Sequence, residues 1–169
     1  GKSTATIKLC DILINQGFSA KCYLEADINN PIDLYWYAYL TKSEYENILA
    51  IYDSFSEEIA ANSVCEEEYA LVRYQDFKRC YYSPELYEYF KTREVCYKAR
   101  NPVPFEMFTR IIFNRWQSLL SSDLPKQDFL IFDGALLAHQ INDIIRNYNP
   151  TDNEILRHLE TIWWIIKPY

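Results

Sequence analysis

Residues 1–4 of the chain are Gly1-Lys2-Ser3-Thr4, and a segment with helical periodicity follows them. Apolar side chains recur at helical spacing from Ala5 to Gln16, and Gly17 is a natural helix stop. The first backbone N–H groups of a helix have no partner within the helix and carry the positive end of its dipole. We therefore predict that the start of this helix binds an anionic phosphate group.

The four residues match the end of the P-loop pattern GxxxxGK[ST]. In that pattern the lysine contacts the outer phosphates of a nucleotide, and the next hydroxyl coordinates Mg²⁺. We predict that Lys2 clamps the phosphates, that Ser3 is a Mg²⁺ ligand, and that Gly1 and Thr4 complete the phosphate-binding set. Because the match is short and the GxxxxG half is not in this chain, a chance helix cap or a cloning remnant is the alternative.

A second candidate element lies far along the chain, where residues 128–134 read Asp-Phe-Leu-Ile-Phe-Asp-Gly. An apolar run without polar alternation predicts a strand buried on both faces of a parallel sheet. The carboxylate of Asp133, at the end of this strand, is a predicted Mg²⁺ ligand. Taken alone, Asp133-Gly134 also fits a simple strand-exit turn. The two elements together, in this order, favour a P-loop fold.

Two acidic residues, Glu25 and Asp27, follow a predicted strand at Phe18–Leu24. Helix, glycine and strand form half of a βαβ unit, and parallel sheets bind ligands at the carboxyl ends of their strands. We predict that Glu25 is the general base for an attacking hydroxyl and that Asp27 contacts the substrate. The alternative is that both are solvated loop acids that cap the next helix.

Two arginines are further candidates for substrate binding, because a guanidinium group recognises phosphate or carboxylate in a bidentate manner. Arg115 precedes Trp116 on a predicted amphipathic helix at Phe105–Leu120. Arg73 ends the segment Tyr69–Arg73, which fits either a short strand or a helical turn. Both arginines also fit an exposed, solvated position.

The rest of the pattern is mostly helical, in keeping with only three glycines in 169 residues. A broken helical region is predicted from Ile32 to Ala61, and two further helices at Ala135–Tyr148 and Asn153–Ile166. We predict a single incomplete domain over residues 1–169, with a helical insertion at about 32–122. A doubly wound sheet needs a strand before the phosphate-binding loop and another after Pro168, so the natural protein is expected to be longer at both ends, which intact-mass analysis would test.

The composition argues against several classes of protein. A net charge of −7 argues against a nucleic-acid or anionic-membrane binder, and no apolar run is long enough to span a membrane. The five cysteines have no CxxC spacing, which predicts free or buried thiols in the cytoplasm. The two histidines, His139 and His158, accompany no serine or cysteine motif, so no nucleophilic triad is predicted. A homodimer is compatible with the sequence.

With these motifs placed, the chain resembles P-loop kinases of the thymidylate-kinase and deoxynucleoside-kinase group. The resemblance implies a helix-rich, three-layer α/β fold of the P-loop NTPases with a parallel sheet, truncated at both ends. It also implies transfer of the γ-phosphoryl group of ATP with Mg²⁺, and it gives Glu25 the role of base toward a sugar hydroxyl. The chain has Asp133-Gly134-Ala135 where the family has Asp-Arg-Tyr or Glu-Arg-Ser, and it contains no arginine-rich lid.

The function predicted from the sequence is therefore an ATP- and Mg²⁺-dependent kinase of a nucleoside, nucleotide or similar small molecule. One alternative is a nucleotide-binding switch or regulatory ATPase without an acceptor, although no Asn-Lys-x-Asp motif for guanine is present. The other is a helical interaction domain in which Gly1-Lys2-Ser3-Thr4 has no role.

Overall fold

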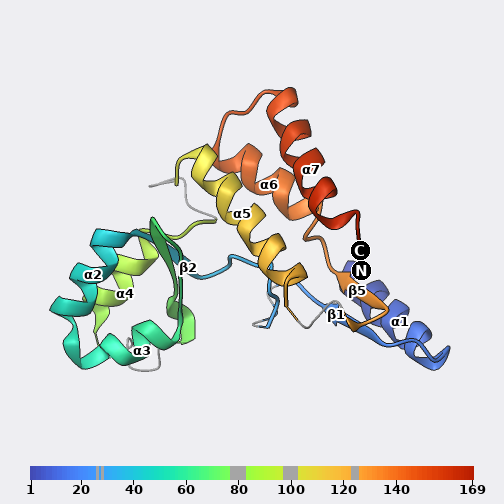
Figure 1. The fold of residues 1–169 in the computed structure, drawn as a ribbon, viewed down its shortest axis with the longest axis horizontal. Coiled ribbons are helices and arrows are strands. Elements are labelled where there is room, and N and C mark those ends of the chain that lie inside the picture. The colour runs from blue at the N-terminus through green and yellow to red at the C-terminus, as the bar shows by residue number, and fades with distance from the viewer. Residues whose placement is uncertain (26, 28, 77–82, 97–102, 123–125) are drawn as a thin grey trace. The chain divides into compact units, whose positions relative to one another are not determined.

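The computed structural model describes residues 1–25, 27, 29–76, 83–96, 103–122 and 126–169 (Figure 1). The chain divides into two compact units, one formed by Gly1–Asp33 with Phe105–Tyr169 and the other by Leu34–Pro104. Each unit combines helices with strands, so the predicted α/β class is confirmed. Within the described ranges, none of the helices has the length and apolar character needed to cross a membrane.

The first unit is built around a two-stranded parallel sheet. It contains α1 (Lys2–Asn15), β1 (Ala20–Tyr23), α5 (Phe105–Leu120), β5 (Phe129–Phe132), α6 (Ala138–Asn147) and α7 (Asp152–Ile166). Strands β1 and β5 pair in register from Ala20 opposite Phe129 to Tyr23 opposite Phe132. The prediction of parallel strands, made from a helix, a glycine and two apolar runs, is confirmed for this pair.

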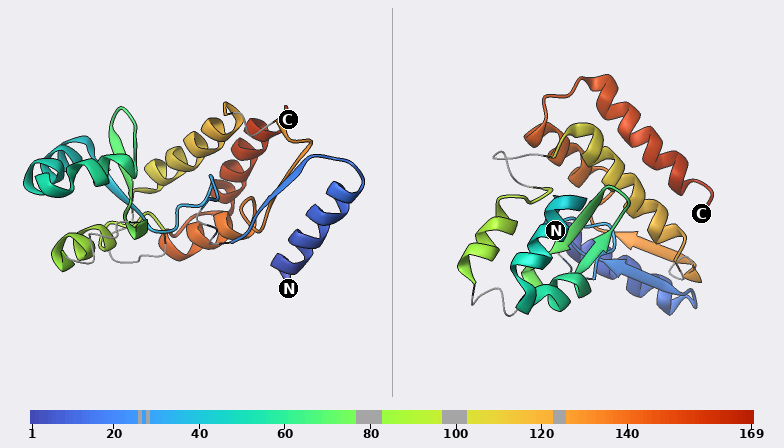
Figure 2. Two further views of the ribbon diagram at one scale, coloured as in Figure 1. Left: turned by 90° about the horizontal axis from the view of Figure 1, so that it is seen from below. Right: turned by 60° about the vertical axis from the view of Figure 1, so that its left-hand side comes forward.

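Successive side chains of a strand point to opposite sides of a sheet. In this unit helices pack on both sides. Cys10 of α1 is buried against Cys22 of β1, while the ring of Trp116 on α5 lies 5.5 Å from that of Phe132. Figure 2 shows α1 on one side of the strands and α5 on the other. The N-terminus of α1 and the carboxyl ends of both strands come to the same edge of the sheet.

Two details of the first unit differ from the sequence prediction. Strand β5 is not buried on both faces, and the side chain of Phe129 is 40% exposed. Among the described residues the sheet has only these two strands, and so narrow a sheet does not shield both faces of β5 from solvent. Helix α6 begins at Ala138, three residues later than predicted, because Gly134 has φ +80° and residues 135–137 form a turn before the helix.

The second unit is a three-stranded antiparallel sheet with helices packed on it. Its elements are β2 (Tyr37–Thr41), α2 (Lys42–Ile51), the 3₁₀ turn η1 (Asp53–Phe55), α3 (Ser56–Ala61), β3 (Ser63–Cys65), β4 (Tyr69–Arg73), the 3₁₀ turn η2 (Tyr74–Asp76) and α4 (Pro84–Lys91). The strand order is β2-β4-β3. The segment Tyr69–Arg73, for which the sequence allowed a strand or a helical turn, forms a strand.

The helical prediction for residues 32–61 is wrong over Tyr37–Thr41, which forms β2. Aromatic residues at alternate positions suit a pleated strand as well as a helix, and pairing with β4 decides between them. The predicted insertion ran over about 32–122 and was helical. The second unit spans Leu34–Pro104, contains three strands, and leaves α5 in the first unit.

The described cysteines Cys10, Cys22, Cys65 and Cys96 are free thiols, and Cys80 lies outside the described residues.

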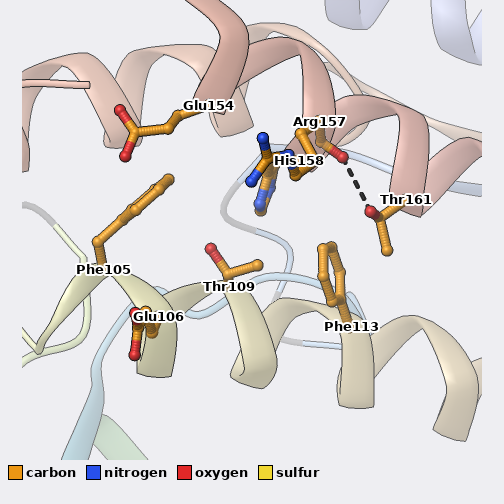
Figure 3. A pocket seen from close by; sticks show the side chains of 8 residues that line it. All are labelled: Phe105, Glu106, Thr109, Phe113, Glu154, Arg157, His158 and Thr161. Atoms are coloured by element: carbon orange, nitrogen blue, oxygen red, sulfur yellow. Dashed lines mark hydrogen bonds between the residues drawn. The ribbon is translucent and has the colours of Figure 1, made fainter. Parts of the chain in front are cut away.

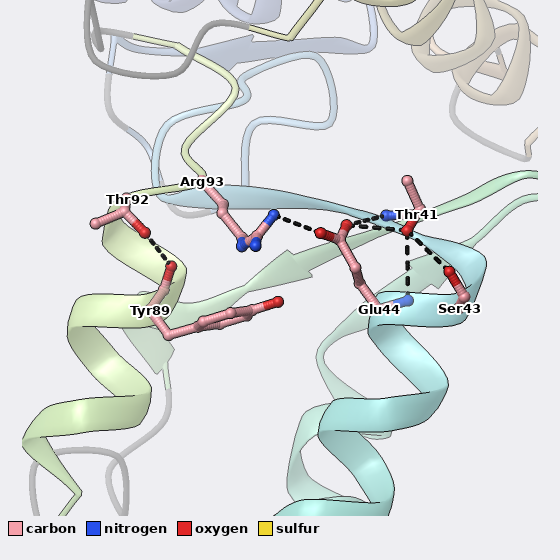
Figure 4. Close-up of polar contacts among 6 residues, drawn as sticks. All are labelled: Thr41, Ser43, Glu44, Tyr89, Thr92 and Arg93. Carbon is pink, nitrogen blue, oxygen red and sulfur yellow. Dashed lines mark hydrogen bonds and ion pairs between the residues drawn. The ribbon is translucent and has the colours of Figure 1, made fainter.

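A polar cluster joins the start of α2 to the segment after α4 (Figure 4). The Thr41 hydroxyl accepts a hydrogen bond from the Glu44 backbone, and the Glu44 carboxylate accepts from the Thr41 backbone at 2.9 Å. Arg93 Nη1 donates to the same carboxylate at 2.7 Å. Burial raises the pKa of Glu44, but the Thr41 hydrogen bonds and the Arg93 charge outweigh it, so the pKa lies below its usual value.

Arg93→Met is therefore expected to destabilise the protein by about 1 kcal/mol at pH 7, the upper end for a partly exposed pair. A lowered carboxyl pKa in the folded state gives stability that is present above pH 4.5, the ordinary value, and lost as pH falls through the folded value. The deficit should therefore shrink below pH 4.5 in urea denaturation. In a Glu44→Gln background the same substitution should cost less, with no such pH dependence. A deficit that persists unchanged in acid would contradict the assignment.

Candidate functional site

The start of α1 is open to an anion. Helix α1 begins at Lys2 with Gly1 as its N-cap, and no side chain caps it. No acidic residue belongs to its first turn, so no side chain of the helix itself neutralises the free N–H groups and the helix dipole. Lys2, Ser3 and Thr4 are exposed on this first turn. An uncapped helix start of this kind is suited to binding an anion.

The two predicted Mg²⁺ ligands are in direct contact. Ser3 Oγ donates a hydrogen bond to Asp133 Oδ2 at 2.7 Å, across 130 positions of sequence. Asp133 follows β5 directly, and its backbone N–H donates to the Tyr23 carbonyl at 2.9 Å, which extends the pairing with β1 by one residue. The carboxylate is buried, with only 3% of the residue exposed. The sheet thus holds Asp133 at the first turn of α1.

Glu25 lies at the same edge, two residues after β1. Its Oε2 is 3.5 Å from Lys2 Nζ, and the two side chains are 50% and 60% exposed. An ion pair between such exposed groups is worth roughly 0.2–1 kcal/mol. Lys2 is therefore free to exchange this carboxylate for a more highly charged partner, such as a phosphate chain, at little cost.

His139 is a further member of the site, which sequence reasoning missed. Its Nε2 is 3.5 Å from Glu25 Oε1, and this buried nitrogen has no hydrogen-bond partner among the described residues. The His139 backbone N–H donates to the Gly134 carbonyl at 3.0 Å, which holds the ring over Gly134. Nothing in the sequence indicates that His139 contacts Glu25 or Gly134, because both contacts depend on the turn at Gly134.

Gly134 lets the histidine approach the end of β5. Its φ of +80° lies in the left-handed region, and a Cβ added there would come within 2.9 Å of His139 Nε2. Gly134→Ala is therefore expected to destabilise the protein by backbone strain of about 1–2 kcal/mol, plus the displacement of His139.

Gly17→Ala is the matched control for Gly134→Ala. Gly17 has φ +92°, but nothing lies within 4 Å of an added Cβ, so only the strain applies. Denaturant unfolding should show the larger loss for Gly134→Ala, and His139→Ala in the same chain should recover the difference. Equal losses at the two glycines would rule out a role for the His139 contact.

The remaining predicted residues are engaged elsewhere. Asp27 Oδ1 accepts from the Asn29 backbone at 2.9 Å in a local turn, and its neighbours 26 and 28 lie outside the described residues. On α5, Arg115 Nη2 donates to the Asp33 carbonyl at 3.3 Å. Arg73 belongs to the second unit, where its guanidinium lies 5.9 Å from the centre of the Tyr37 ring. None of these contacts involves the site at α1.

The oxygen donors of Ser3 and Asp133 suit Mg²⁺, which proteins bind through one or two carboxylates while substrate phosphates and water supply the other ligands. In the described part of the chain, no cluster of three or more His, Cys, Asp or Glu side chains could hold a metal without such help. The residues present thus fit a metal ion that arrives with a phosphate ligand.

The arrangement brings together, at one sheet edge, a helix start, a lysine, a hydroxyl with a buried carboxylate, and a second carboxylate beside a histidine. Comparisons of the chain with models of protein families, with curated proteins and with solved structures found no match.

Proposed function

We propose that this chain is part of an ATP- and Mg²⁺-dependent phosphotransferase with the three-layer fold of P-loop kinases. The single observation that carries the proposal is the 2.7 Å hydrogen bond from Ser3 to Asp133. The sequence motifs nominate these two residues, 130 positions apart, as ligands of one metal ion. A chance Gly-Lys-Ser-Thr at a helix start gives no reason for its serine to meet a carboxylate at the end of a parallel strand.

In this proposal the phosphates of ATP lie against the N–H groups of the first turn of α1. Lys2 leaves Glu25 and pairs with the outer phosphates, which carry more charge than one carboxylate. Ser3 and Asp133 would hold Mg²⁺, which would neutralise charge on the phosphate oxygens. Thr4 and the backbone of Gly1 contribute further phosphate contacts.

Loss of the Lys2 pair leaves Glu25 as an exposed carboxylate next to the phosphates, where an acceptor hydroxyl would lie. The acceptor oxygen attacks the γ-phosphorus, the bond from that phosphorus to the β–γ bridging oxygen breaks, and ADP leaves. Glu25 takes the proton of the hydroxyl, as general-base catalysis requires. His139, beside the other oxygen of Glu25, is suited to orient this carboxylate.

The acceptor class is proposed to be a nucleoside, a nucleotide or a similar small molecule. The experiment is transfer of label from [γ-³²P]ATP with Mg²⁺ to a panel of nucleosides and nucleotides, with products separated by chromatography. Label in a phosphorylated acceptor supports the kinase. Label recovered only as inorganic phosphate, at the same slow rate with and without every acceptor, would support the alternative, a nucleotide-binding switch.

A further inference from the structure

A cavity of about 320 Å³ lies between α5 and α7 in the first unit (Figure 3). Phe105, Thr109 and Phe113 line it from α5, and Arg157 and His158 line it from α7. No lining residue belongs to the phosphate site, and its volume is at the lower end of the range for small-molecule pockets. Its occupant would therefore be a small organic molecule rather than a nucleotide.

His158 lines this cavity and is only 2% exposed. Its ring stacks with those of Phe108 and Phe113, at centroid distances of 6.2 and 5.3 Å. On its other side, Nε2 lies 3.1 Å from Gln140 Oε1. The position of the remaining ring nitrogen, Nδ1, is thereby fixed.

The hydrogen-bond network assigns the proton on His158. The Gln140 side-chain amide donates to the Ala135 carbonyl at 3.2 Å, so its oxygen is the atom that faces the histidine. An oxygen accepts, and Nε2 therefore carries the hydrogen. Burial lowers the pKa of His158 to about 4, so the ring is neutral at pH 7 and Nδ1 has a lone pair to offer.

Two buried polar atoms at the cavity have no partner in the part of the chain that the structure describes. They are His158 Nδ1, an acceptor, and Thr109 Oγ1, whose hydroxyl can donate. Figure 3 shows both side chains pointing into the space between the two helices. Buried polar groups are nearly always hydrogen-bonded to protein, water or a ligand, so two such atoms at one cavity point to an occupant that completes their bonds.

We propose that this cavity is a binding site for a small, uncharged, planar molecule that carries an N–H donor and a carbonyl acceptor. The donor bonds to His158 Nδ1, the carbonyl accepts from the Thr109 hydroxyl, and the flat body lies among the rings of Phe105 and Phe113. The charged lining residues are Glu106, Glu154 and Arg157. The two carboxylates outnumber the one guanidinium, so the lining repels an anion and phosphate compounds are not the occupant.

The role of the ligand's N–H donor is tested with two probes, 2-pyridone and N-methyl-2-pyridone, which differ only in the substituent on the ring nitrogen. Both have the same ring and carbonyl, but the second has no N–H. The protein has two histidines, so the imidazole ¹⁵N signals of His158 are assigned by comparison with His139→Ala. 2-Pyridone should shift the His158 Nδ1 signal saturably, and the N-methyl compound should bind at least tenfold more weakly. Equal binding of both probes, or of neither, overturns the proposal.

Variants test the two protein atoms separately. In His158→Gln the new amide nitrogen takes the place of Nε2, which keeps the contact to Gln140 and removes the Nδ1 acceptor. Thr109→Val removes the hydroxyl at equal size, and it is expected to raise the unfolding temperature because the lost hydroxyl is unsatisfied. Each should weaken 2-pyridone binding by roughly tenfold.

Thr161→Val is the matched control, because the Thr161 hydroxyl lines the same cavity but already donates to the Arg157 carbonyl at 2.8 Å. It should bind 2-pyridone as the wild type does. Wild-type affinity in Thr109→Val overturns the proposal even if His158→Gln fails to fold.

Discussion

Lys2→Ala is expected to lower kcat/KM for phosphoryl transfer by about 10²–10³-fold, or ~2.7–4 kcal/mol of transition-state stabilisation. In the proposed reaction the ammonium group leaves an exposed, weak ion pair with Glu25 and neutralises charge on the outer phosphates. The fold should tolerate the change, because the side chain is 60% exposed. Steady-state kinetics with ATP and the acceptor from the label-transfer panel measure the effect.

Lys8→Ala is the control for this substitution. Lys8 is exposed on the same helix but lies beyond its first turn, so its charge is not at the proposed phosphate site. Its kcat/KM should stay within about twofold of wild type. An equal loss in both variants would point to damage to α1, and full activity of Lys2→Ala would remove Lys2 from the mechanism.

Asp133→Asn is expected to raise the Mg²⁺ concentration needed for half-maximal activity by roughly 10–100-fold. The amide keeps the size of the carboxylate and can still accept from Ser3, but it loses the charge that would hold the proposed metal ion. Because a buried carboxylate is replaced by a neutral group, the unfolding temperature should not fall substantially. The measurement is a Mg²⁺ titration at saturating ATP for the variant and the wild type.

Asp128→Asn is the matched control for Asp133→Asn, since it removes the same charge just before the other end of β5. Asp128 is bonded to the backbone and hydroxyl of Ser19 at 2.8 Å, away from α1. Its Mg²⁺ dependence should match that of the wild type. An unchanged Mg²⁺ requirement in Asp133→Asn would mean that Asp133 only supports Ser3.

The meeting of Ser3, Glu25 and Asp133 followed from local patterns in the sequence. Each pattern places its residue at a helix start or a strand end, and parallel strands bring these ends to one edge of a sheet. The hydrogen bond between Ser3 and Asp133 brings together two residues that a shared metal site would need. Their chemical roles stay predictions.

His139 and the strand Tyr37–Thr41 were beyond the reach of the same reasoning. His139 joins the site through the left-handed turn at Gly134, and a lone Asp-Gly pair does not specify which later side chain packs on it. For Tyr37–Thr41, aromatic periodicity permitted a helix, and only pairing with β4 determines a strand. Contacts between segments distant in sequence decided both cases, as they do for the cavity at His158.

The most direct test of the central claim is a thermal-shift titration of the protein with Mg²⁺-ATP, with Lys2→Ala measured alongside. A ligand that binds only the folded state stabilises it by about 2.7 kcal/mol at a hundred times its Kd. The account predicts a concentration-dependent rise in Tm for the wild type that is absent or strongly weakened in Lys2→Ala. No rise in either protein would contradict it, and Gly1-Lys2-Ser3-Thr4 would then be a helix start without a phosphate ligand.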